Sequence, residues 1–332
     1  MAATRVLAVL SAHGPAGEAN QELLAVARRL ADQAGGIVTA LLLRDAAGAA
    51  AAFACGADEV VTATAPWLEG CSAEACAEAI AAACAELQPA VVLLTHDDTG
   101  RDAAPGLAAR LGGALISDCV SLGLDGTTGA LTGTRPCFSG KALSEWVAEG
   151  PGPKVATIRP RSMAPAAPPA PRTGVPRVLP LPMTVAMRTR VLERVAPPAG
   201  QARLEDADVV IAVGRGVGSR EAFQRYFSEG LAKALGAPCG GSRGAVDMGI
   251  VPPEWQIGLT GRMVSPKLYV AVGLSGSPQH MAGCSGAQTI VAVNIDPQAP
   301  IFGFAHYGVV ADYREAVPAL TTRLQELLAA GR

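Results

Sequence analysis

The sequence predicts an α/β protein of two domains, each a Rossmann-like parallel sheet with flanking helices. Short apolar segments alternate with helical stretches in the first third of the chain, and the alternation restarts at Ala207. Such alternation is typical of parallel sheets whose crossover connections are helices. Between the two regions, residues 160–198 contain ten prolines, which exclude a helix there. A chain of 332 residues is long enough to give each domain its own core.

The first domain, residues 1–200, begins with a regular βα pattern. Strands are expected at Val6–Leu10, Ile37–Leu43, Glu59–Val61 and Ala90–Leu94, and helices at Gln21–Ala34, Ala73–Leu87 and Asp102–Leu111. The pattern then changes to short, closely spaced segments separated by glycines. These segments, Ala130–Arg135, Ala142–Val147 and Val155–Arg159, are expected to be antiparallel strands.

The proline-dense segment, about 160–200, predicts an extended and fairly stiff connector. Within it, Met183–Val195 alternates and is expected to form one more strand. The second domain, residues 205–332, is expected to start after a boundary near 198–206. Its expected elements are a strand at Asp208–Val213, a helix capped by Ser219, strands at 268–273 and 289–293, and a final helix at Glu315–Ala330.

Composition excludes several classes of protein. Half of the residues are hydrophobic, but no apolar run reaches the roughly eighteen residues of a membrane-spanning helix. A net charge of -2 gives no electrostatic footprint for nucleic acid. The eight cysteines include no Cys-x-x-Cys and the four histidines are far apart, so we expect no metal site. The N-terminus lacks the pattern of a signal or transit peptide, and we expect a bacterial-type cytoplasmic location.

Two apolar strands near the C-terminus end in polar, glycine-rich turns. The first leads into Ser277-Pro278, which indicates an N-cap and first helical position, so the N–H groups of Gln279 and His280 are expected to face a crevice. The second ends at Asn294, where a parallel sheet presents ligand-binding side chains. An ordinary βα turn with a surface histidine is the competing interpretation.

The turn Gly214–Gly218 approaches a dinucleotide-binding fingerprint but lacks its last spacing. No acidic residue ends the next strand at the distance such sites require. This leaves open two alternatives: a nicotinamide-dependent oxidoreductase and a nucleotide-binding regulatory module.

The chain resembles the α subunit of electron transfer flavoproteins in several motifs. They are Leu268-Tyr-Val-Ala-Val-Gly-Leu-Ser-Gly-Ser-Pro-Gln-His280, Ile290-Val-Ala-Val-Asn-Ile-Asp-Pro-Gln-Ala-Pro300, Gly214–Gly216, Gly241–Asp247, Gln256–Gly261 and Thr99–Pro105. The resemblance is densest from about residue 209 onward. It implies an electron carrier without a substrate-transforming site of its own, which binds one FAD per α chain in its C-terminal domain.

The resemblance also implies the residues that contact FAD. They are Arg215, Ser242, Arg243, Gln256, Ile257, Gly258, Leu259, Thr260, Ser275, Gly276, Ser277, Pro278, Gln279, His280, Asn294, Asp312 and Tyr313. Among them, Arg243 would lie over the isoalloxazine and His280 near O2 at the pyrimidine edge, where negative charge develops on reduction. Three residues depart from the family pattern: Leu259 replaces a glutamine, Pro278 a β-branched residue, and His306 an aspartate near Asp312.

The partners implied by the resemblance are a β subunit, which forms the heterodimer and holds AMP or a second FAD, and flavin dehydrogenases such as the acyl-CoA dehydrogenase of fatty acid β-oxidation. A membrane-bound electron transfer flavoprotein-quinone oxidoreductase would receive the electrons. The departures leave open a flavin-bifurcating paralogue or one specialised for a particular dehydrogenase.

Overall fold

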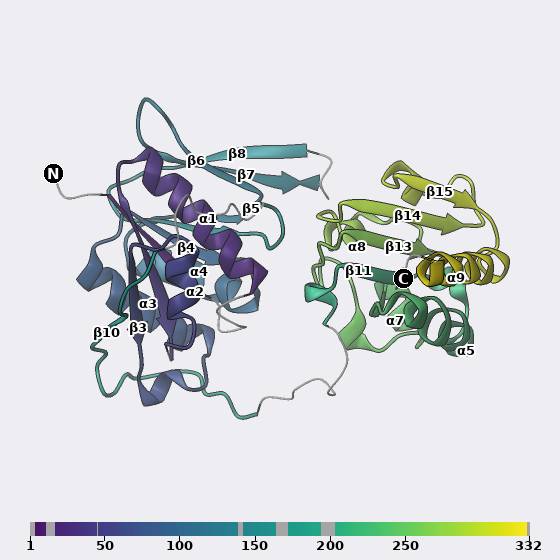
Figure 1. Ribbon diagram of the computed structural model, residues 1–332, viewed down its shortest axis with the longest axis horizontal. Coiled ribbons are helices and arrows are strands. Elements are labelled where there is room, and N and C mark those ends of the chain that lie inside the picture. Colours follow the sequence, from purple (N-terminus) through teal and green to yellow (C-terminus); the bar gives the residue numbers. More distant parts are fainter. Residues whose placement is uncertain are drawn as a thin grey trace. The chain divides into compact units, whose positions relative to one another are not determined.

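The computed structural model contains two compact units, one of Met1–Pro136 with Leu143–Val195 and the other of Ala196–Arg332 with Cys137–Ala142 (Figure 1). The structure describes residues 4–10, 17–44, 46–138, 142–163, 172–193 and 203–330. The predicted boundary near 198–206 therefore lies largely outside the described residues.

The first unit is built on a seven-stranded parallel sheet in the order β10-β3-β2-β1-β4-β9-β5. The strands are β1 (Arg5–Leu10), β2 (Ile37–Leu43), β3 (Glu59–Ala63), β4 (Val91–Thr95), β5 (Ala114–Cys119), β9 (Lys154–Ile158) and β10 (Arg177–Leu179). The helices are α1 (Glu18–Gln33), α2 (Ala49–Ala54), the 3₁₀ turn η1 (Pro66–Leu68), α3 (Ala73–Leu87) and α4 (Asp98–Arg110). The predicted parallel α/β fold is confirmed.

Helices cover both faces of this sheet because its strands are apolar on both sides (Figure 1). In β1, Val6 and Ala8 enter the core shared with α1, whereas Leu7 and Val9 enter the core shared with α3 and α4. Successive side chains of a strand point to opposite faces, so a continuous apolar run marks a strand buried on both sides.

Two sequence-based expectations need correction in this unit. Val155–Arg159 is not an antiparallel strand: β9 lies between β4 and β5 and pairs in parallel with both, because its residues are buried on both faces. The expected helix Asp102–Leu111 begins four residues earlier, because the side chain of Asp97 accepts the N–H of Gly100 at 2.8 Å and caps it. The separate three-stranded sheet consists of β6 (Ser121–Leu124), β7 (Leu131–Cys137) and β8 (Ala142–Ala148), with β6 and β7 antiparallel.

Within the proline-dense segment, the described residues 172–193 pack on the first unit. Its strand is Arg177–Leu179, which pairs with β3, and not Met183–Val195, whose described part to residue 193 has no strand. Prolines 180 and 182 interrupt the ladder by removing N–H donors. Side chains hold the chain instead: Trp67 Nε1 donates to the carbonyl of Pro182 at 2.9 Å.

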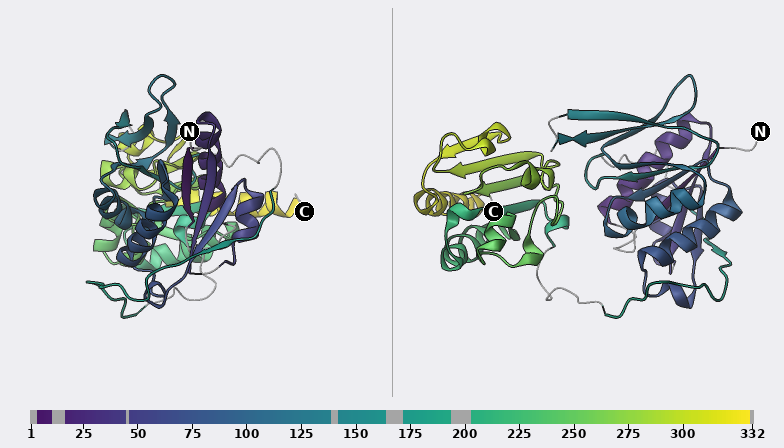
Figure 2. Two further views of the ribbon diagram at one scale, coloured as in Figure 1. Left: turned by 90° about the vertical axis from the view of Figure 1, so that its left-hand side faces the viewer. Right: turned by 180° about the vertical axis from the view of Figure 1, so that it is seen from behind.

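The second unit is a five-stranded parallel sheet in the order β12-β11-β13-β14-β15. Its strands are β11 (Val209–Val213), β12 (Cys239–Gly241), β13 (Leu268–Val272), β14 (Thr289–Asn294) and β15 (Tyr307–Val310). Its helices are α5 (Arg220–Ala222), the π-helix η5 (Phe223–Ala232), α6 (Lys233–Leu235), α7 (Arg243–Asp247), α8 (Pro278–Ala282) and α9 (Tyr313–Ala330), with 3₁₀ turns η3 (Leu204–Asp206), η4 (Arg215–Val217), η6 (Pro253–Trp255) and η7 (Pro300–Gly303). The yellow α9 packs beside η5 (Figure 2), where Tyr313 contacts Phe227.

Glu22 on α1 joins the helix to the chain that follows β9. It is 2% exposed, and its carboxylate accepts the backbone N–H groups of Arg161, at 2.7 Å, and Met163. We expect Glu22→Ala to lower the free energy of unfolding by about 2–3 kcal/mol, because two backbone donors lose their acceptor in a buried site. Urea denaturation measures the loss. Glu18→Ala, on the exposed side of the same helix, is the matched control and should change it by less than about 1 kcal/mol.

Candidate functional site

Four loops at the carboxyl edge of the second sheet enclose a cavity of about 340 Å³. Arg215 follows β11, Ser242 follows β12, Ser275 follows β13, and the loop Gln256–Gly261 closes the fourth side. The lining residues are Arg215, Ser242, Arg243, Gly244, Asp247, Gln256, Ile257, Gly258, Leu259, Thr260, Leu274, Ser275, Gly276, Ser277, Gln279 and His280. Ligands of open α/β sheets bind at this edge.

The loops after β11 and β13 are held together by their backbones. The N–H of Gly214 donates to the carbonyl of Val272 at 2.9 Å, and the N–H of Gly216 donates to that of Gly273 at 3.2 Å. A Cβ on Gly214 would lie 2.0 Å from the oxygen of Gly273, so only glycine permits this approach. Arg215 and Ser275, in these two loops, both line the cavity.

The loop Gln256–Gly261 is fixed by hydrogen bonds on both sides. The N–H of Ile257 donates to the carbonyl of Gly241 at 2.8 Å, and the N–H of Leu259 donates to that of Gln279 at 2.8 Å. The side chain of Leu259 is 66% exposed, and the hydroxyl of Thr260 accepts from the amide of Gln256 at 3.0 Å. Because Gln279 accepts the Leu259 N–H, that donor is not available to a ligand.

His280 is buried, and both of its ring nitrogens have protein partners. Nδ1 lies 3.0 Å from the carbonyl oxygen of Ile257, and Nε2 lies 2.8 Å from the hydroxyl of Tyr269, which is itself fully buried. A carbonyl only accepts, so Nδ1 carries the proton and Nε2 accepts from Tyr269. Burial lowers the pKa of His280 to about 4, against the hydrogen bond to Ile257, which raises it. The imidazole is therefore neutral at pH 7 and holds the Gln256–Gly261 loop against α8.

The predicted N-cap Ser277 and first helical position Pro278 are confirmed, and Gln279 and His280 line the cavity, but the expectation that the N–H of His280 is free is wrong. Helix α8 has only five residues, and the backbone N–H of His280 donates to the carbonyl of Ser277 at 3.0 Å. A helix this short has few aligned peptide dipoles. The charged side chains at the cavity are those of Arg215, Arg243 and Asp247. The side chain of Arg243 is 72% exposed and lies 3.9 Å from the carboxylate of Asp247.

The cavity brings together thirteen of the seventeen residues that the sequence singles out, all except Pro278, Asn294, Asp312 and Tyr313. Asn294 lies behind the wall, where its amide donates to the carbonyl of Leu274 at 2.8 Å. Tyr313 is buried and donates to the carbonyl of Val217 at 2.8 Å, so it supports the loop that carries Arg215. The carboxylate of Asp312 accepts the N–H of Arg314, which caps α9 and lowers the pKa of Asp312.

The sequence analysis missed Gly244, Asp247 and Leu274 as lining residues. Gly244 packs so tightly on Arg215 that a Cβ would lie 2.8 Å from its Cδ, a contact between distant segments that no local pattern reveals. The expectation that His306 lies near Asp312 also needs correction. Nδ1 of His306 accepts the N–H of Ile290, at the amino end of β14. It therefore lies at the opposite end of β15 from Asp312.

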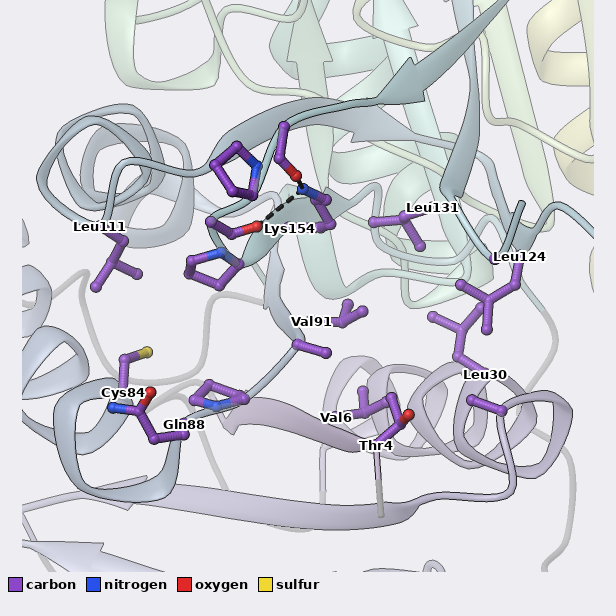
Figure 3. Close-up of a pocket in the computed structure, with 18 of the residues that line it drawn as sticks. Thr4, Val6, Leu30, Cys84, Gln88, Val91, Leu111, Leu124, Leu131 and Lys154 are labelled. Atoms are coloured by element: carbon purple, nitrogen blue, oxygen red, sulfur yellow. Dashed lines mark hydrogen bonds between the residues drawn. The ribbon is translucent and has the colours of Figure 1, made fainter. Parts of the chain in front are cut away.

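A larger cavity, about 970 Å³, lies in the first unit at the amino ends of the strands (Figure 3). Its walls are mostly aliphatic side chains, prolines and glycines, including Val6, Val91 and Leu131. Lys154 donates to the carbonyls of Gly150 and Gly152, the latter at 2.8 Å, so backbone oxygens satisfy this cation. Because the larger cavity lies at the amino ends of its strands and ligands of open α/β sheets bind at the carboxyl ends, we place the candidate site in the smaller cavity of the second unit.

The residues around the smaller cavity fit a dinucleotide. They supply two exposed arginines for phosphate or ring contacts, the hydroxyls of Ser275 and Ser277, and a backbone that approaches closely at Gly276. Gly276 has a φ of +81°, and a Cβ there would lie 2.4 Å from the nitrogen of Ile301. Within the described residues, no group of three or more His, Cys, Asp or Glu side chains could hold a metal ion.

Comparison with known proteins identifies the class. Residues 5–184 match the electron transfer flavoprotein domain, and residues 203–285 match the electron transfer flavoprotein FAD-binding domain. The chain is 36% identical to the electron transfer flavoprotein subunit alpha of Thermoanaerobacterium thermosaccharolyticum, over 92% of this chain and 93% of that protein. It is 39% identical to the Bacillus subtilis subunit alpha, over 82% of each chain, and 41% identical to protein FixB of Azotobacter vinelandii, over 74% of this chain and 69% of that one.

The chain belongs to the electron transfer flavoprotein α-subunit family. The family is one of electron carriers whose C-terminal domain binds flavin and whose α chain pairs with a β subunit. No helix among the described residues is both long and apolar enough to cross a bilayer.

The low pKa of His280 makes stability depend on pH. The unfolded chain binds a proton on His280 below about pH 6.5, whereas the folded chain does so only below about pH 4. The stabilisation from the neutral ring is therefore complete above pH 6.5 and is lost as the pH falls toward 4, by about 1.4 kcal/mol per pH unit.

We expect the free energy of unfolding, measured by urea denaturation, to fall more between pH 7 and pH 5 in the unmodified protein than in the His280→Gln variant. Tyr269→Phe keeps the His280 imidazole and its burial. This variant should retain the pH dependence of stability, while its free energy of unfolding should be lower by about 1–2 kcal/mol at both pH values. Equal losses in the unmodified protein and His280→Gln would show that the ring is not buried in its neutral form.

Proposed function

We propose that the chain is the α subunit of a heterodimeric electron transfer flavoprotein and holds one FAD at the cavity of its C-terminal domain, residues 205–332. The observation that carries the proposal is the convergence of thirteen family-matched residues on one cavity at the carboxyl edge of the second sheet. Residues 1–200 form the scaffold for the β subunit, which holds AMP or, in a bifurcating paralogue, a second FAD. The chain acts as an electron carrier and has no substrate-transforming site of its own.

A bound flavin supplies one- and two-electron chemistry, and this chain's residues bind it and set its surroundings. Arg215 and Arg243 place positive charge at the cavity, which favours phosphate groups and the negative charge that reduction adds. The neutral His280 positions the Gln256–Gly261 loop and adds no charge. Electrons come from acyl-CoA dehydrogenase or another flavin dehydrogenase and pass to a quinone oxidoreductase.

Flavin retention tests the proposal on the co-purified α and β chains. Absorption spectra should show about one flavin per α chain beyond any flavin assigned to the β subunit. Gly276→Ala should lose most of the α-chain flavin, because a Cβ at φ +81° would displace the Ser275–Ser277 loop. Gly303→Ala is the matched control, since a Cβ there meets open space. A colourless protein that binds a nicotinamide nucleotide would overturn the proposal.

The charge of Arg243 should raise the potential of the bound flavin. We expect Arg243→Ala to lower the potential of the first reduction step by no more than about 40 mV. An exposed charge interaction contributes about 1 kcal/mol or less, and 1.4 kcal/mol corresponds to 59 mV for one electron. Spectroelectrochemical titration of the heterodimer measures the shift. Arg220→Ala removes an exposed arginine that does not line the cavity, and should leave the potential unchanged.

A further inference from the structure

Two cysteines at the start of α3 lie in direct contact. The Sγ atoms of Cys71 and Cys76 are 3.1 Å apart, and all eight cysteines of the chain are thiols. Ser72 caps α3, so Cys71 directly precedes the cap and Cys76 is the fourth helical residue. Side chains at these two positions commonly pack together as a hydrophobic staple. A disulfide bond is about 2.05 Å long, so the sulfurs are about 1 Å from bonding distance.

The two thiols differ in access. Cys76 is 1% exposed, whereas Cys71 is half-buried. The hydrogen bond to Cys71, followed by burial, raises the pKa of Cys76 far above its ordinary value. Because Cys71 is half-buried and Cys76 is buried, Cys71 is the sulfur that a dissolved reagent reaches first. This division of roles, with one accessible thiol and one protected neighbour, suits stepwise disulfide exchange.

The same turn of α3 anchors the connector that leads toward the second unit. The carboxylate of Glu74 accepts the backbone N–H and hydroxyl of Thr189 at 2.9 and 2.6 Å, and also the backbone N–H of Arg188. Leu181 and Met187 of the connector pack on the small core that contains Cys76. The two sulfurs thus lie within the surface that holds residues 181–189 in place.

We propose that Cys71 and Cys76 form a reversible dithiol–disulfide pair that reacts with low-molecular-weight disulfides such as oxidised glutathione, and that the bond locks the connector to the first unit. The Cys71 thiolate attacks one sulfur of glutathione disulfide and releases one glutathione thiolate. The Cys76 thiol then gives up its proton and attacks the Cys71 sulfur of the mixed disulfide, which releases the second glutathione. Two protein thiols are oxidised and one glutathione disulfide is reduced to two thiols, so atoms and electrons balance.

Thiol mapping of the full-length chain tests the bond. After incubation with glutathione disulfide, the peptide that contains both cysteines should lose two hydrogens in mass and resist alkylation until dithiothreitol is added. Cys76→Ser should instead leave a stable glutathione adduct on Cys71. Cys84→Ser is the matched control, since Cys84 is a buried cysteine of the same helix, and it should leave the pair reactive.

Limited trypsin digestion tests the lock at Arg188 and Arg190, two exposed connector residues. Oxidation should slow cleavage there roughly tenfold, because the bond restricts opening of the turn that carries Glu74. Cys71→Ser, which changes the half-buried partner, should abolish the effect of oxidant on the cleavage rate. The proposal is overturned if both thiols stay fully alkylatable, if only glutathione adducts form in the unmodified chain, or if the oxidised and reduced chains are cleaved at the same rate.

Discussion

The cavity depends on the close approach of two glycine loops. The N–H groups of Gly214 and Gly216 donate to the carbonyls of Val272 and Gly273. These hydrogen bonds hold the segments at the carboxyl ends of β11 and β13 together. No side chain fits between them, because a Cβ on Gly214 would lie 2.0 Å from the oxygen of Gly273. Tyr313 strengthens the arrangement from the core by donating to the carbonyl of Val217 in the same loop. A dinucleotide site that uses backbone contacts requires such an approach, since bulky side chains would occupy the space.

His280 shows how a site residue can act through another part of the chain. A histidine that lines a cavity suggests a charged donor, yet burial and the partners of this ring keep it neutral. Its contact with Ile257 joins α8 to the Gln256–Gly261 loop, and the N–H of Leu259 adds a second link to the carbonyl of Gln279. Two walls of the cavity are thereby fixed to each other, and positive charge is supplied by the exposed arginines.

Local sequence patterns predict most of this fold, and they fail where tertiary contacts decide. The strands from Ile37 to Leu43 and from Leu268 to Val272 follow directly from continuous apolar runs. The direction of β9 does not, because a short apolar strand pairs with whichever neighbours bury it, here β4 and β5. The site residues cluster because strand ends meet at one edge, but the positions of Tyr313 and His306 depend on packing against Val217 and Ile290.

The first sheet shows that the fold alone does not create the site. Its carboxyl edge also gathers polar residues, since Asp118 binds Arg159 through two hydrogen bonds of 2.9 and 2.7 Å. Nearby, Nδ1 of His96 lies 2.8 Å from the hydroxyl of Thr157, and burial lowers the pKa of this histidine. These groups satisfy one another, whereas at the second sheet Arg215 and Arg243 are exposed around a cavity. The ion pair of Asp118 and Arg159 is largely buried, whereas the pair of Arg243 and Asp247 is exposed at a cavity, so two sheets of the same class present different carboxyl edges.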